Sequence, residues 1–346
     1  MATHSREGHS PAADAAIRLE TERVEACPLC GSTATRPWRR DCRDWQQPHI
    51  MQRFAYDRCT QCGAYFLAAR PIPSELGKVY FSAYGPYQPA PEPDFDPPAS
   101  HLVTRAAALP LRAMGAALGL PGRRRLSQMF DWTYTPETPG EILLDYGCGA
   151  PTFLDDARER GFATIGVDFS EPVLEVVRAS GHEAHLVGED FERGVQDSSV
   201  SCVRMNHVIE HLYHPRPTLA AVRSKMRRGA RIHISTPNPG SIGSRLFGRR
   251  WHALDCPRHV VLYLPRVLRR MLAQAGFHDV SVVHEVGPKD LTRSWGIVLY
   301  DRGRIRHEQV AAMATDPVRS GVFWPLASLG AVVGIADRYH VFARVA

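Results

Sequence analysis

The sequence predicts an α/β fold in which a parallel, doubly wound sheet follows a small metal-binding module. Three observations lead to this prediction. Short apolar runs alternate with helical patterns from Glu141 to about Gly287, which is typical of a parallel sheet covered by helices. A glycine-rich turn follows the first of these runs. Two Cys-x-x-Cys-Gly motifs near the N-terminus predict the separate module.

The chain has 346 residues, enough for one catalytic domain of about 200 residues and a smaller module. Six prolines between residues 85 and 100 indicate a semi-rigid linker. We therefore expect a disordered tail over residues 1–22, a zinc-ribbon-like module over 23–84, the linker over 85–100, and a catalytic domain over 101–346 with a helical insert at about 288–336.

Charge and cysteine usage restrict the function classes. The net charge of +6 is modest, and lysine occurs only at positions 78, 225 and 289, so no lysine-rich stripe predicts a nucleic-acid partner. The eight cysteines do not resemble a disulfide framework, and residues 1–16 lack the apolar core of a secretory signal. We expect a cytoplasmic protein.

The paired cysteines predict a structural metal centre. Cys27 and Cys30 form one knuckle, Cys59 and Cys62 form the other, and each is followed by glycine. Glycine permits the positive φ that turns backbone N–H groups toward sulfur, and four thiolates suit tetrahedral Zn²⁺. A closed site of this kind supplies folding energy rather than chemistry. The long spacing between the knuckles predicts an inserted hairpin over residues 38–54, and redox disulfides are the alternative.

The region between module and sheet carries two further expectations. The aromatic segment Tyr80–Tyr87 suits either a lid over the cleft or packing between domains. Residues 101–130 are apolar with arginines and contain Pro110 and Pro121, which predicts two short helices because proline interrupts helical hydrogen bonding. No run reaches the length of a membrane span.

The glycine turn predicts where a ligand lies. Residues 142–144 are an apolar run of the kind buried on both faces of a parallel sheet. Gly147 and Gly149 then let the backbone approach a ligand closely, and Pro151 suits the start of a helix.

Two ligand classes use such a turn. The dinucleotide pattern G-x-G-x-x-G fails at Thr152, whereas the pattern acid-x-G-x-G-x-G begins at Asp145 and fails at Pro151. A carboxylate at Asp145 would repel a pyrophosphate but attract the sulfonium and amino groups of S-adenosylmethionine. The charge of Asp145 therefore favours S-adenosylmethionine.

From this turn onward the sequence resembles the class I S-adenosylmethionine-dependent methyltransferases, which have a Rossmann-like sheet of seven strands. Residues 165–170 look like their second strand, whose acid holds the ribose hydroxyls. Residues 188–191 resemble the turn whose acid contacts the adenine amino group, and residues 205–212 resemble the fourth-strand motif that faces the methyl group. The cofactor-binding residues implied are Asp145, Gly147, Cys148, Gly149, Asp168, Phe169, Asp190, Phe191 and Asn206.

The remaining elements follow from periodicity and turn residues. We expect strands at 141–145, 163–168, 184–188, 199–205, 230–235 and near 280–286, and helices at 151–160, 171–180, 216–227 and 264–276. The resemblance implies a last, antiparallel strand at 339–345. The apolar run 321–335 is too short to cross a bilayer. Burial as a core helix is its commoner fate, and covering an acceptor pocket or peripheral contact with a membrane surface are the alternatives.

Three histidines are candidate catalytic bases. Methyl transfer is an in-line displacement, and a hydroxyl or activated carbon must also lose a proton, for which a histidine is well suited. His207 and His211 lie at the end of the fourth strand, and packing or capping is their structural alternative. His259 lies in Asp255-x-Pro-Arg-His259, a stretch that resembles relatives of the ubiquinone-type O-methyltransferases.

Neighbours of His259 are candidate acceptor contacts. Trp251 is expected to stack on a ring and Arg258 to hold an anionic group. His207 and His211 have ligand-like spacing, but no third ligand is apparent near the cleft, so no metal is expected in the chemistry.

The function predicted is methyl transfer from S-adenosylmethionine to oxygen, or less favoured carbon, of a small or carrier-linked acceptor in secondary-metabolite or glycan biosynthesis. An RNA nucleotide methyltransferase that recruits RNA through the zinc module is one alternative. A non-catalytic module that binds the sulfonium, with Pro151 marking a decayed loop, is the other.

Overall fold

The computed structural model describes residues 17–80 and 102–346. The predicted linker, residues 81–87 of the aromatic segment and most of the predicted tail lie outside these residues.

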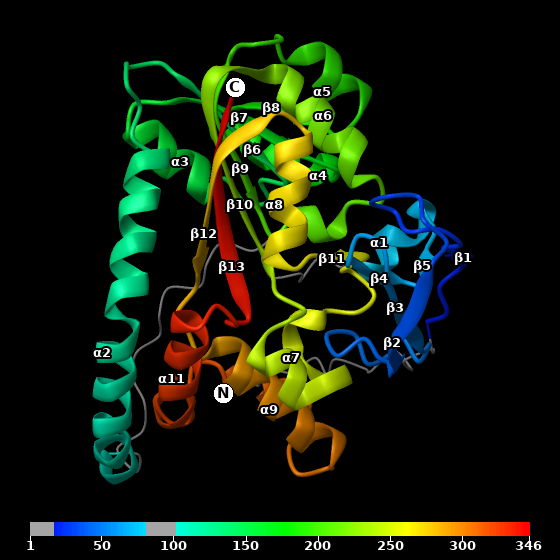
Figure 1. Ribbon diagram of the computed structural model, residues 1–346, viewed down its shortest axis with the longest axis vertical. Helices are drawn as coiled ribbons and strands as arrows, with labels where there is room; N and C mark the ends of the chain where they lie inside the picture. The colour runs from blue at the N-terminus through cyan, green and yellow to red at the C-terminus, as the bar shows by residue number, and fades with distance from the viewer. Residues whose placement is uncertain (1–16, 81–101) are drawn as a thin grey trace, which may run out of the picture.

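A seven-stranded sheet forms the centre of the molecule, with the order β12-β13-β10-β9-β6-β7-β8 (Figure 1). β13 pairs antiparallel with both β10 and β12, whereas the pairs from β10 to β8 are parallel. This confirms the predicted methyltransferase-type sheet. Its strands are β6 (Ile142–Tyr146), β7 (Ala163–Asp168), β8 (Glu183–Leu186), β9 (Val200–Asn206), β10 (Met226–Pro237), β12 (Phe277–His284) and β13 (Arg338–Val345).

Helices cover both faces of the sheet because each has one apolar side. In α8 (Pro265–Gln274), Leu268 and Leu272 are fully buried while the arginines between them face outward. The other helices that alternate with the parallel strands are α3 (Thr152–Glu159), α4 (Glu171–Ala179), α5 (Glu189–Gly194) and α6 (Pro215–Lys225). The alternation places the carboxyl ends of β6, β7 and β9 at one edge, where ligands of such sheets bind.

The N-terminal module is joined to the catalytic domain by a shared sheet (Figure 1). β2 (Thr35–Cys42) and β3 (Phe54–Cys59) form the hairpin expected between the knuckles, and β4 (Tyr65–Leu67) continues it. The fourth strand, β11 (Val261–Leu262), comes from the catalytic domain and pairs with β4. Apolar side chains of both parts belong to one continuous core. β1 (Thr21–Arg23), β5 (Ala69–Pro71), a 3₁₀ turn (Pro73–Glu75) and α1 (Leu76–Val79) complete the module.

The expectation of two short helices after the linker is wrong. α2 runs without interruption from Leu102 to Thr133 with Pro110 and Pro121 inside it. A proline costs a helix one hydrogen bond, but tertiary packing overrides that preference. α2 uses Gly115 and Gly119 to pack closely against α11 and β12, so the contact surface depends on a continuous helix.

The segment between β12 and β13 is helical. α9 (Lys289–Asp301), α10 (Glu308–Ala312) and α11 (Pro317–Val332) follow one another. α11 buries Ala327 and Ser328 but exposes Val322 and Leu329, so the run expected to form a core helix is buried on one side alone. Among the described helices, none has the length and hydropathy needed to span a bilayer. α7 (Ile242–Phe247) and two 3₁₀ turns (Gly248–Arg250 and His252–Leu254) follow β10, and a third (Ile209–His211) follows β9.

Candidate functional site

The glycine turn lies between β6 and α3 and requires its glycines. Gly147 and Gly149 have φ values of 76° and 56°, a region that disfavours side chains with a Cβ. A Cβ at Gly147 would lie 2.4 Å from Cγ2 of Val208, in the loop after β9. The turn and the fourth-strand motif are therefore packed directly against one another.

Asp145 is fully buried beneath this turn. Its Oδ2 accepts a hydrogen bond of 2.6 Å from Arg204, and its Oδ1 is buried without a partner in the described part of the chain. Burial raises the pKa of Asp145 to about 6. A buried acceptor without a donor is the type of group that a cationic ligand above the turn satisfies.

Asp168 connects the end of β7 to the glycine turn. Its Oδ2 accepts from the Gly149 N–H at 3.1 Å and its Oδ1 accepts from the Ser170 N–H at 3.0 Å. Burial raises the pKa of Asp168. Phe169, the next residue, is 47% exposed, and its ring lies 5.1 Å from that of Tyr80. The acid and the exposed ring together offer a polar and a flat apolar contact beside the turn.

The other residues implied for the cofactor lie in different environments. Asp190 accepts a 2.7 Å hydrogen bond from the Leu186 N–H after β8. Cys148 is buried, and Phe191 is buried with its ring edge-on to Tyr146. Asn206 is partly exposed at the end of β9. The Phe191 side chain is therefore part of the core and does not reach a surface that a ligand contacts.

His207 is held on both ring nitrogens. It has a left-handed backbone, with φ 56°, which is uncommon outside glycine. Its Nδ1 lies 3.0 Å from Glu210 Oε1, and its Nε2 lies 2.7 Å from Arg338 Nη1. Because arginine only donates, Nε2 accepts and Nδ1 carries the proton. Burial, with Arg338 nearby, lowers the pKa of His207.

His211 contacts the N-terminal module. Its Nδ1 lies 3.0 Å from the carbonyl oxygen of Arg258 and 2.8 Å from the hydroxyl oxygen of Tyr80. A carbonyl only accepts, so Nδ1 donates and the lone pair is on Nε2. Burial, followed by the effect of His259, lowers the pKa of His211 to about 4. At neutral pH His211 is an uncharged imidazole.

His259 completes the cluster. Its ring is 4.7 Å from that of His211, and its Nδ1 donates to the Ala253 carbonyl at 3.0 Å. Its Nε2 lies 3.8 Å from a carboxylate oxygen of Glu210 and 3.8 Å from one of Asp255. The structure thus brings all three predicted histidines together.

The expectation that no third ligand-type residue lies near the cleft is wrong. Ligand atoms of Glu210, His211 and His259 lie within 4.8 Å of one another. Glu210 is fully buried and accepts from His207 and, at 2.9 Å, from Thr236 Oγ1. The carboxylate therefore orders His207 through a hydrogen bond and lies beside His259 as a charged neighbour.

Two contributors to the cluster were not found from the sequence. Tyr80 follows α1 of the N-terminal module, and Arg338 begins β13. The aromatic content of residues 80–87 was the one signal for Tyr80. No feature of the neighbouring sequence indicated Arg338, because its contact with His207 depends on the antiparallel insertion of β13.

Comparison with known proteins identifies the catalytic domain. Residues 112–282 match the family model of a methyltransferase domain. The catalytic domain belongs to the class I S-adenosylmethionine-dependent methyltransferases. It is 30% identical over 143 residues to malonyl-[acyl-carrier protein] O-methyltransferase of Serratia marcescens, a match covering 41% of this chain and 55% of that protein.

A second relative of this methyltransferase is ubiquinone biosynthesis O-methyltransferase of Idiomarina loihiensis, 26% identical over 156 residues, with 41% and 64% of the two chains covered. The chain thus spans less than two thirds of either relative. A methyltransferase from Archaeoglobus fulgidus of solved structure aligns with a TM-score of 0.43 and 22% identity, over 64% of this chain and 91% of that one.

Two acceptor contacts expected for the methyltransferase are wrong. Trp251 is fully buried, and its indole N–H donates to Asp337 at 2.7 Å, so its ring does not face a ligand. Arg258 is also buried, with hydrogen bonds to Asp44 of 2.6 and 2.8 Å and one of 2.9 Å to Asp255. Two carboxylates already neutralise this guanidinium, which joins the catalytic domain to the N-terminal module.

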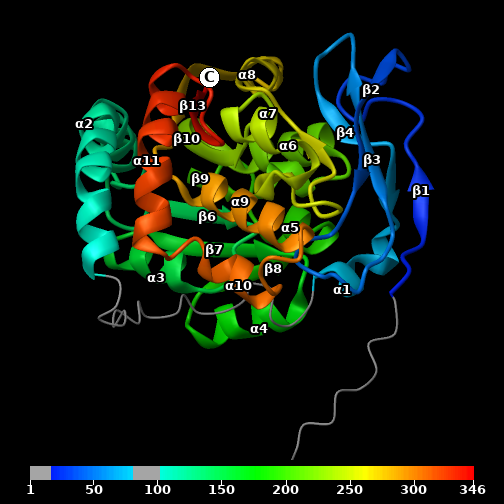
Figure 2. The same ribbon diagram turned by 90° about the horizontal axis from the view of Figure 1, so that it is seen from below.

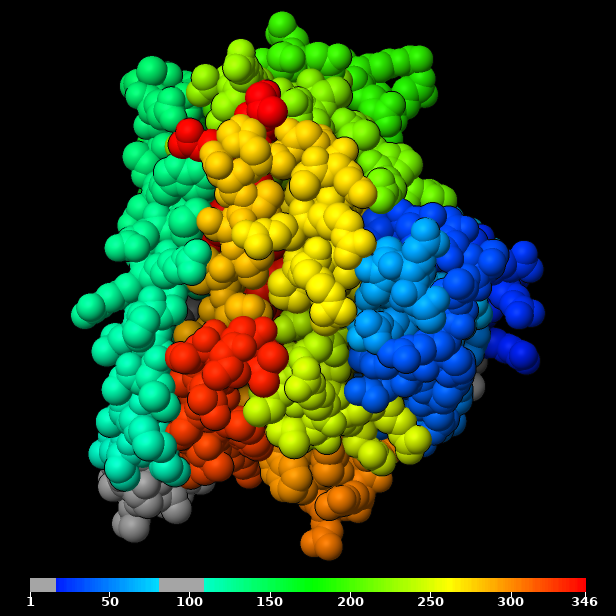
Figure 3. Space-filling model, in the orientation of Figure 1, coloured from blue at the N-terminus to red at the C-terminus, as the bar shows by residue number. Residues whose placement is uncertain are grey.

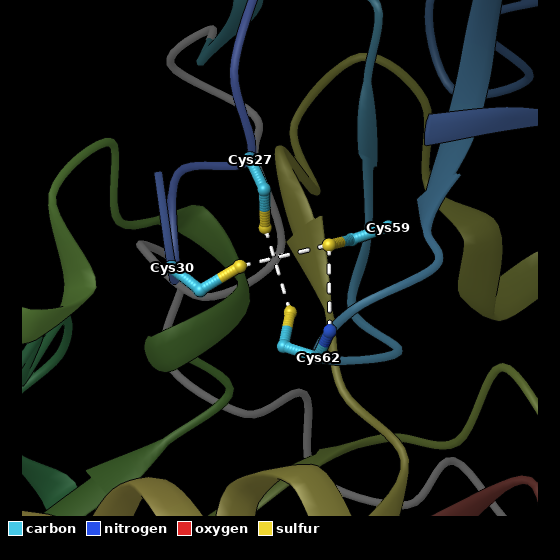
Figure 4. Close-up of side chains that lie close together, drawn as sticks. All are labelled: Cys27, Cys30, Cys59 and Cys62. Atoms are coloured by element: carbon cyan, nitrogen blue, oxygen red, sulfur yellow. Dashed lines mark hydrogen bonds between the residues drawn. The ribbon is translucent and has the colours of Figure 1, made fainter. Parts of the chain in front are cut away.

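The four knuckle cysteines of the methyltransferase converge at one point (Figure 4). The Sγ atoms of Cys27 and Cys62 are 3.6 Å apart, as are those of Cys30 and Cys59. Zn–S bonds of about 2.3 Å in a tetrahedron place sulfurs about 3.8 Å apart, so the spacing fits zinc.

The backbone of the knuckles supports the same arrangement. Gly31 and Gly63 have φ values of 72° and 86°, as expected for the residue after each pair. Backbone N–H groups of Cys62 and Ala64 donate to the sulfurs of Cys59 and Cys62 at 3.4 and 3.5 Å. The hydrogen bond from Cys27 is the first cause that lowers the pKa of Cys62 to about 5. At Cys62 these contacts favour thiolate, the form that binds a metal, whereas the same hydrogen bond raises the pKa of its donor Cys27.

Proposed function

We propose that the protein transfers a methyl group from S-adenosylmethionine to an oxygen atom, with carbon the less favoured target, of a small or carrier-linked acceptor in secondary-metabolite or glycan biosynthesis. One observation carries this proposal. The carboxylate of Asp168 and the histidine cluster after β9 lie at the carboxyl ends of parallel strands, on either side of the same glycine turn. Two relatives whose names are O-methyltransferases support oxygen as the target.

The residues around the turn fit the cofactor. Asp168 would release its hydrogen bond from Gly149 to accept from the ribose hydroxyls, and Phe169 would contact the adenine ring. Asp145 would offer its buried Oδ1 to positive charge above the turn. Bound S-adenosylmethionine supplies an electrophilic methyl group. Asp190, which caps the end of the next strand, would contact the adenine edge.

His211 is the residue best suited to take the acceptor's proton. His207 already accepts from Arg338 on its basic nitrogen, whereas His211 is neutral and keeps its Nε2 lone pair. Tyr80, 2.8 Å from Nδ1, and the Arg258 carbonyl hold the ring in this tautomer. The carboxylates of Glu210 and Asp255 would stabilise the imidazolium that forms on proton transfer.

Zinc would be structural in this account. The four-thiolate centre closes the N-terminal module, which contributes Tyr80 to the site and Asp44 to the buried pair with Arg258. Four protein ligands leave no open position for a substrate. The metal would therefore act on catalysis by fixing the module that holds Tyr80.

The test is a turnover assay that measures S-adenosylhomocysteine released with panels of phenols, sugar hydroxyls and dicarboxylates joined to a carrier through one thioester. Methylation of an acceptor oxygen is the expected result, and for hydroxyl acceptors His211→Ala should reduce it by about 10²- to 10⁴-fold with cofactor binding retained. Cofactor binding without turnover on any panel would instead favour the non-catalytic interaction module.

A further inference from the structure

Exposed apolar side chains gather on two helices far from the zinc module. Sixteen large apolar side chains are exposed among the described residues, and nine of these belong to α2, α11 or the residue after α11. They are Leu109, Leu111, Met114, Leu118, Leu120, Val322, Leu329, Val332 and Val333. Apolar side chains that gather on one part of a surface indicate an interaction site.

α2 and α11 form a rigid, close-packed pair, visible side by side at one flank of the sheet in Figures 1 and 2. A Cβ at Gly115 would lie 2.8 Å from the backbone carbon of Trp324, and one at Gly119 would lie 3.3 Å from Ser328 Oγ. Ser328 Oγ also donates to the Gly115 carbonyl at 2.6 Å. The two helices therefore run in the same direction and meet along the glycine side of α2.

Each helix turns an apolar stripe toward solvent. On α2 the stripe is Leu111, Met114 and Leu118, and on α11 it is Val322, Leu329 and Val332. Helical spacing places the members of each set on one side of their helix. Since the helices are right-handed and parallel, the two stripes face the same side of the pair. We call this surface the α2–α11 face; both helices contribute to the view in Figure 3.

The charge around the α2–α11 face is positive. No Asp or Glu occurs from residue 102 to 130 or from 317 to 332. Arg112, Arg124 and Arg125 are exposed on α2. An apolar stripe beside arginines, without acids, complements a membrane surface that carries anionic headgroups. A second copy of the same face would instead bring like charges together.

The α2–α11 face is also connected to the catalytic end of the sheet. α11 leads within six residues to Arg338, the first residue of β13, which contacts His207. Asp337 in this connection binds Ser241 and Trp251 on the loops after β10. A surface docked through α11 would therefore lie near the loops that surround the histidine cluster.

We propose that the α2–α11 face docks the protein onto an anionic lipid bilayer, with both helices lying along the surface. The inference goes beyond the proposed methyl transfer and does not depend on it. Burial of the apolar stripes in the headgroup region drives binding, and the arginines select anionic lipid.

The experiment is co-sedimentation with vesicles of equal parts phosphatidylglycerol and phosphatidylcholine, and with vesicles of phosphatidylcholine alone. The wild-type chain is expected to bind the anionic vesicles, to bind them less as salt rises, and to leave the neutral vesicles unbound. The double variant Leu118→Glu/Leu329→Glu should lose at least about tenfold in partitioning. Arg124→Gln/Arg125→Gln should lose about fivefold for each charge removed.

Val176→Glu, at an exposed position of α4, is the matched control and should bind like the wild type. Thermal unfolding checks that every variant is folded. Absence of wild-type binding to anionic vesicles, or equal binding by the double variant, would overturn the proposal. A wild-type dimer in light scattering that the double variant converts to monomer would also overturn it, by assigning the face to a second copy.

Discussion

The two flanks of the central sheet differ in how their surfaces are packed. On one flank the N-terminal module is joined to the catalytic domain by β4–β11 pairing, by the buried Arg258–Asp44 pair and by the Tyr80–His211 contact. On the other flank α2 and α11 pack against each other through glycine yet leave apolar stripes exposed. Buried polar contacts thus fix the geometry of the site, whereas the opposite flank exposes apolar side chains among the described residues. Variants of the metal centre, the buried ion pair and the site residues test how the first flank fixes this geometry.

Loss of the metal centre should have the largest effect. Cys59→Ser removes one thiolate ligand, and structural zinc contributes about 10 kcal/mol or more to folding of small domains. That equals the whole stability of many domains, about 5–15 kcal/mol. We expect the purified variant to lack zinc and to unfold at a much lower temperature, measured by elemental mass spectrometry and calorimetry.

Cys42→Ser is the control for this experiment. Cys42 is buried in β2 outside the four-cysteine cluster, so its serine variant should retain one zinc per chain. Wild-type protein that carries no zinc, or a Cys59→Ser variant with unchanged metal content, contradicts the assignment.

Breaking the buried ion pair should have the next largest effect on stability. Asp44→Asn leaves Arg258 with one carboxylate partner, and removing one member of a buried pair costs about 3–5 kcal/mol. The exposed pair of Arg40 and Asp57 supplies the comparison, because Asp57→Asn should cost less than about 1 kcal/mol. Chemical denaturation measures both. Equal costs would mean that the module is not locked to the catalytic domain by this pair.

His211→Ala should reduce turnover by about 10²- to 10⁴-fold, the usual contribution of a general base, while binding of S-adenosylhomocysteine is kept. The pKa of His211 is lowered to about 4, so the wild-type rate should stay constant from neutral pH downward and fall as pH approaches 4. His214→Ala, three residues further along, is the control and should be active. A wild-type profile that falls near pH 6.5 would point to an unperturbed histidine.

Asp145 should make a smaller, pH-dependent contribution to stability. Its pKa is raised to about 6 by burial, whereas an unfolded aspartate has a pKa of about 3.9. The unfolded chain therefore loses this proton first as pH rises, and the wild type loses stability between about pH 4 and pH 6. The stability of Asp145→Asn relative to wild type should rise by up to about 3 kcal/mol across that range. Asp155→Asn, at an exposed carboxylate, should show no such trend.

Much of the fold could be predicted because its signals are local. The strand over residues 163–168 was predicted at its observed bounds, since an apolar run between a glycine turn and an acid has few alternatives. The positive φ values of Gly31 and Gly63 could likewise be predicted, because glycine follows each cysteine pair. α2 could not be predicted as one helix, because the compensation for Pro110 and Pro121 comes from α11, about 200 residues away.

The three histidines of the cluster could be predicted from the sequence, but Tyr80, Arg338 and the contacts within the cluster could not. Spacing along one strand and its loop pointed to His207 and His211, which the structure brings close to His259. Trp251 and Arg258 have the chemistry of ligand contacts. In the structure, however, Trp251 donates its indole hydrogen bond to Asp337, and Arg258 donates to Asp44. Their partners come from distant segments, and no property of the local sequence distinguishes a buried arginine with two acids from an exposed one.

Equilibrium binding of S-adenosylhomocysteine to the wild type and to Asp168→Ala, measured by calorimetry, decides whether the glycine turn and Asp168 form a cofactor site. Asp155→Ala, on the first helix after the turn, serves as the folded control. We expect clear binding by the wild type and the control, and a loss of at least about tenfold for Asp168→Ala because charge-assisted hydrogen bonds to the ribose are removed. Equal affinity for all three chains, or no binding by the wild type, would contradict this assignment.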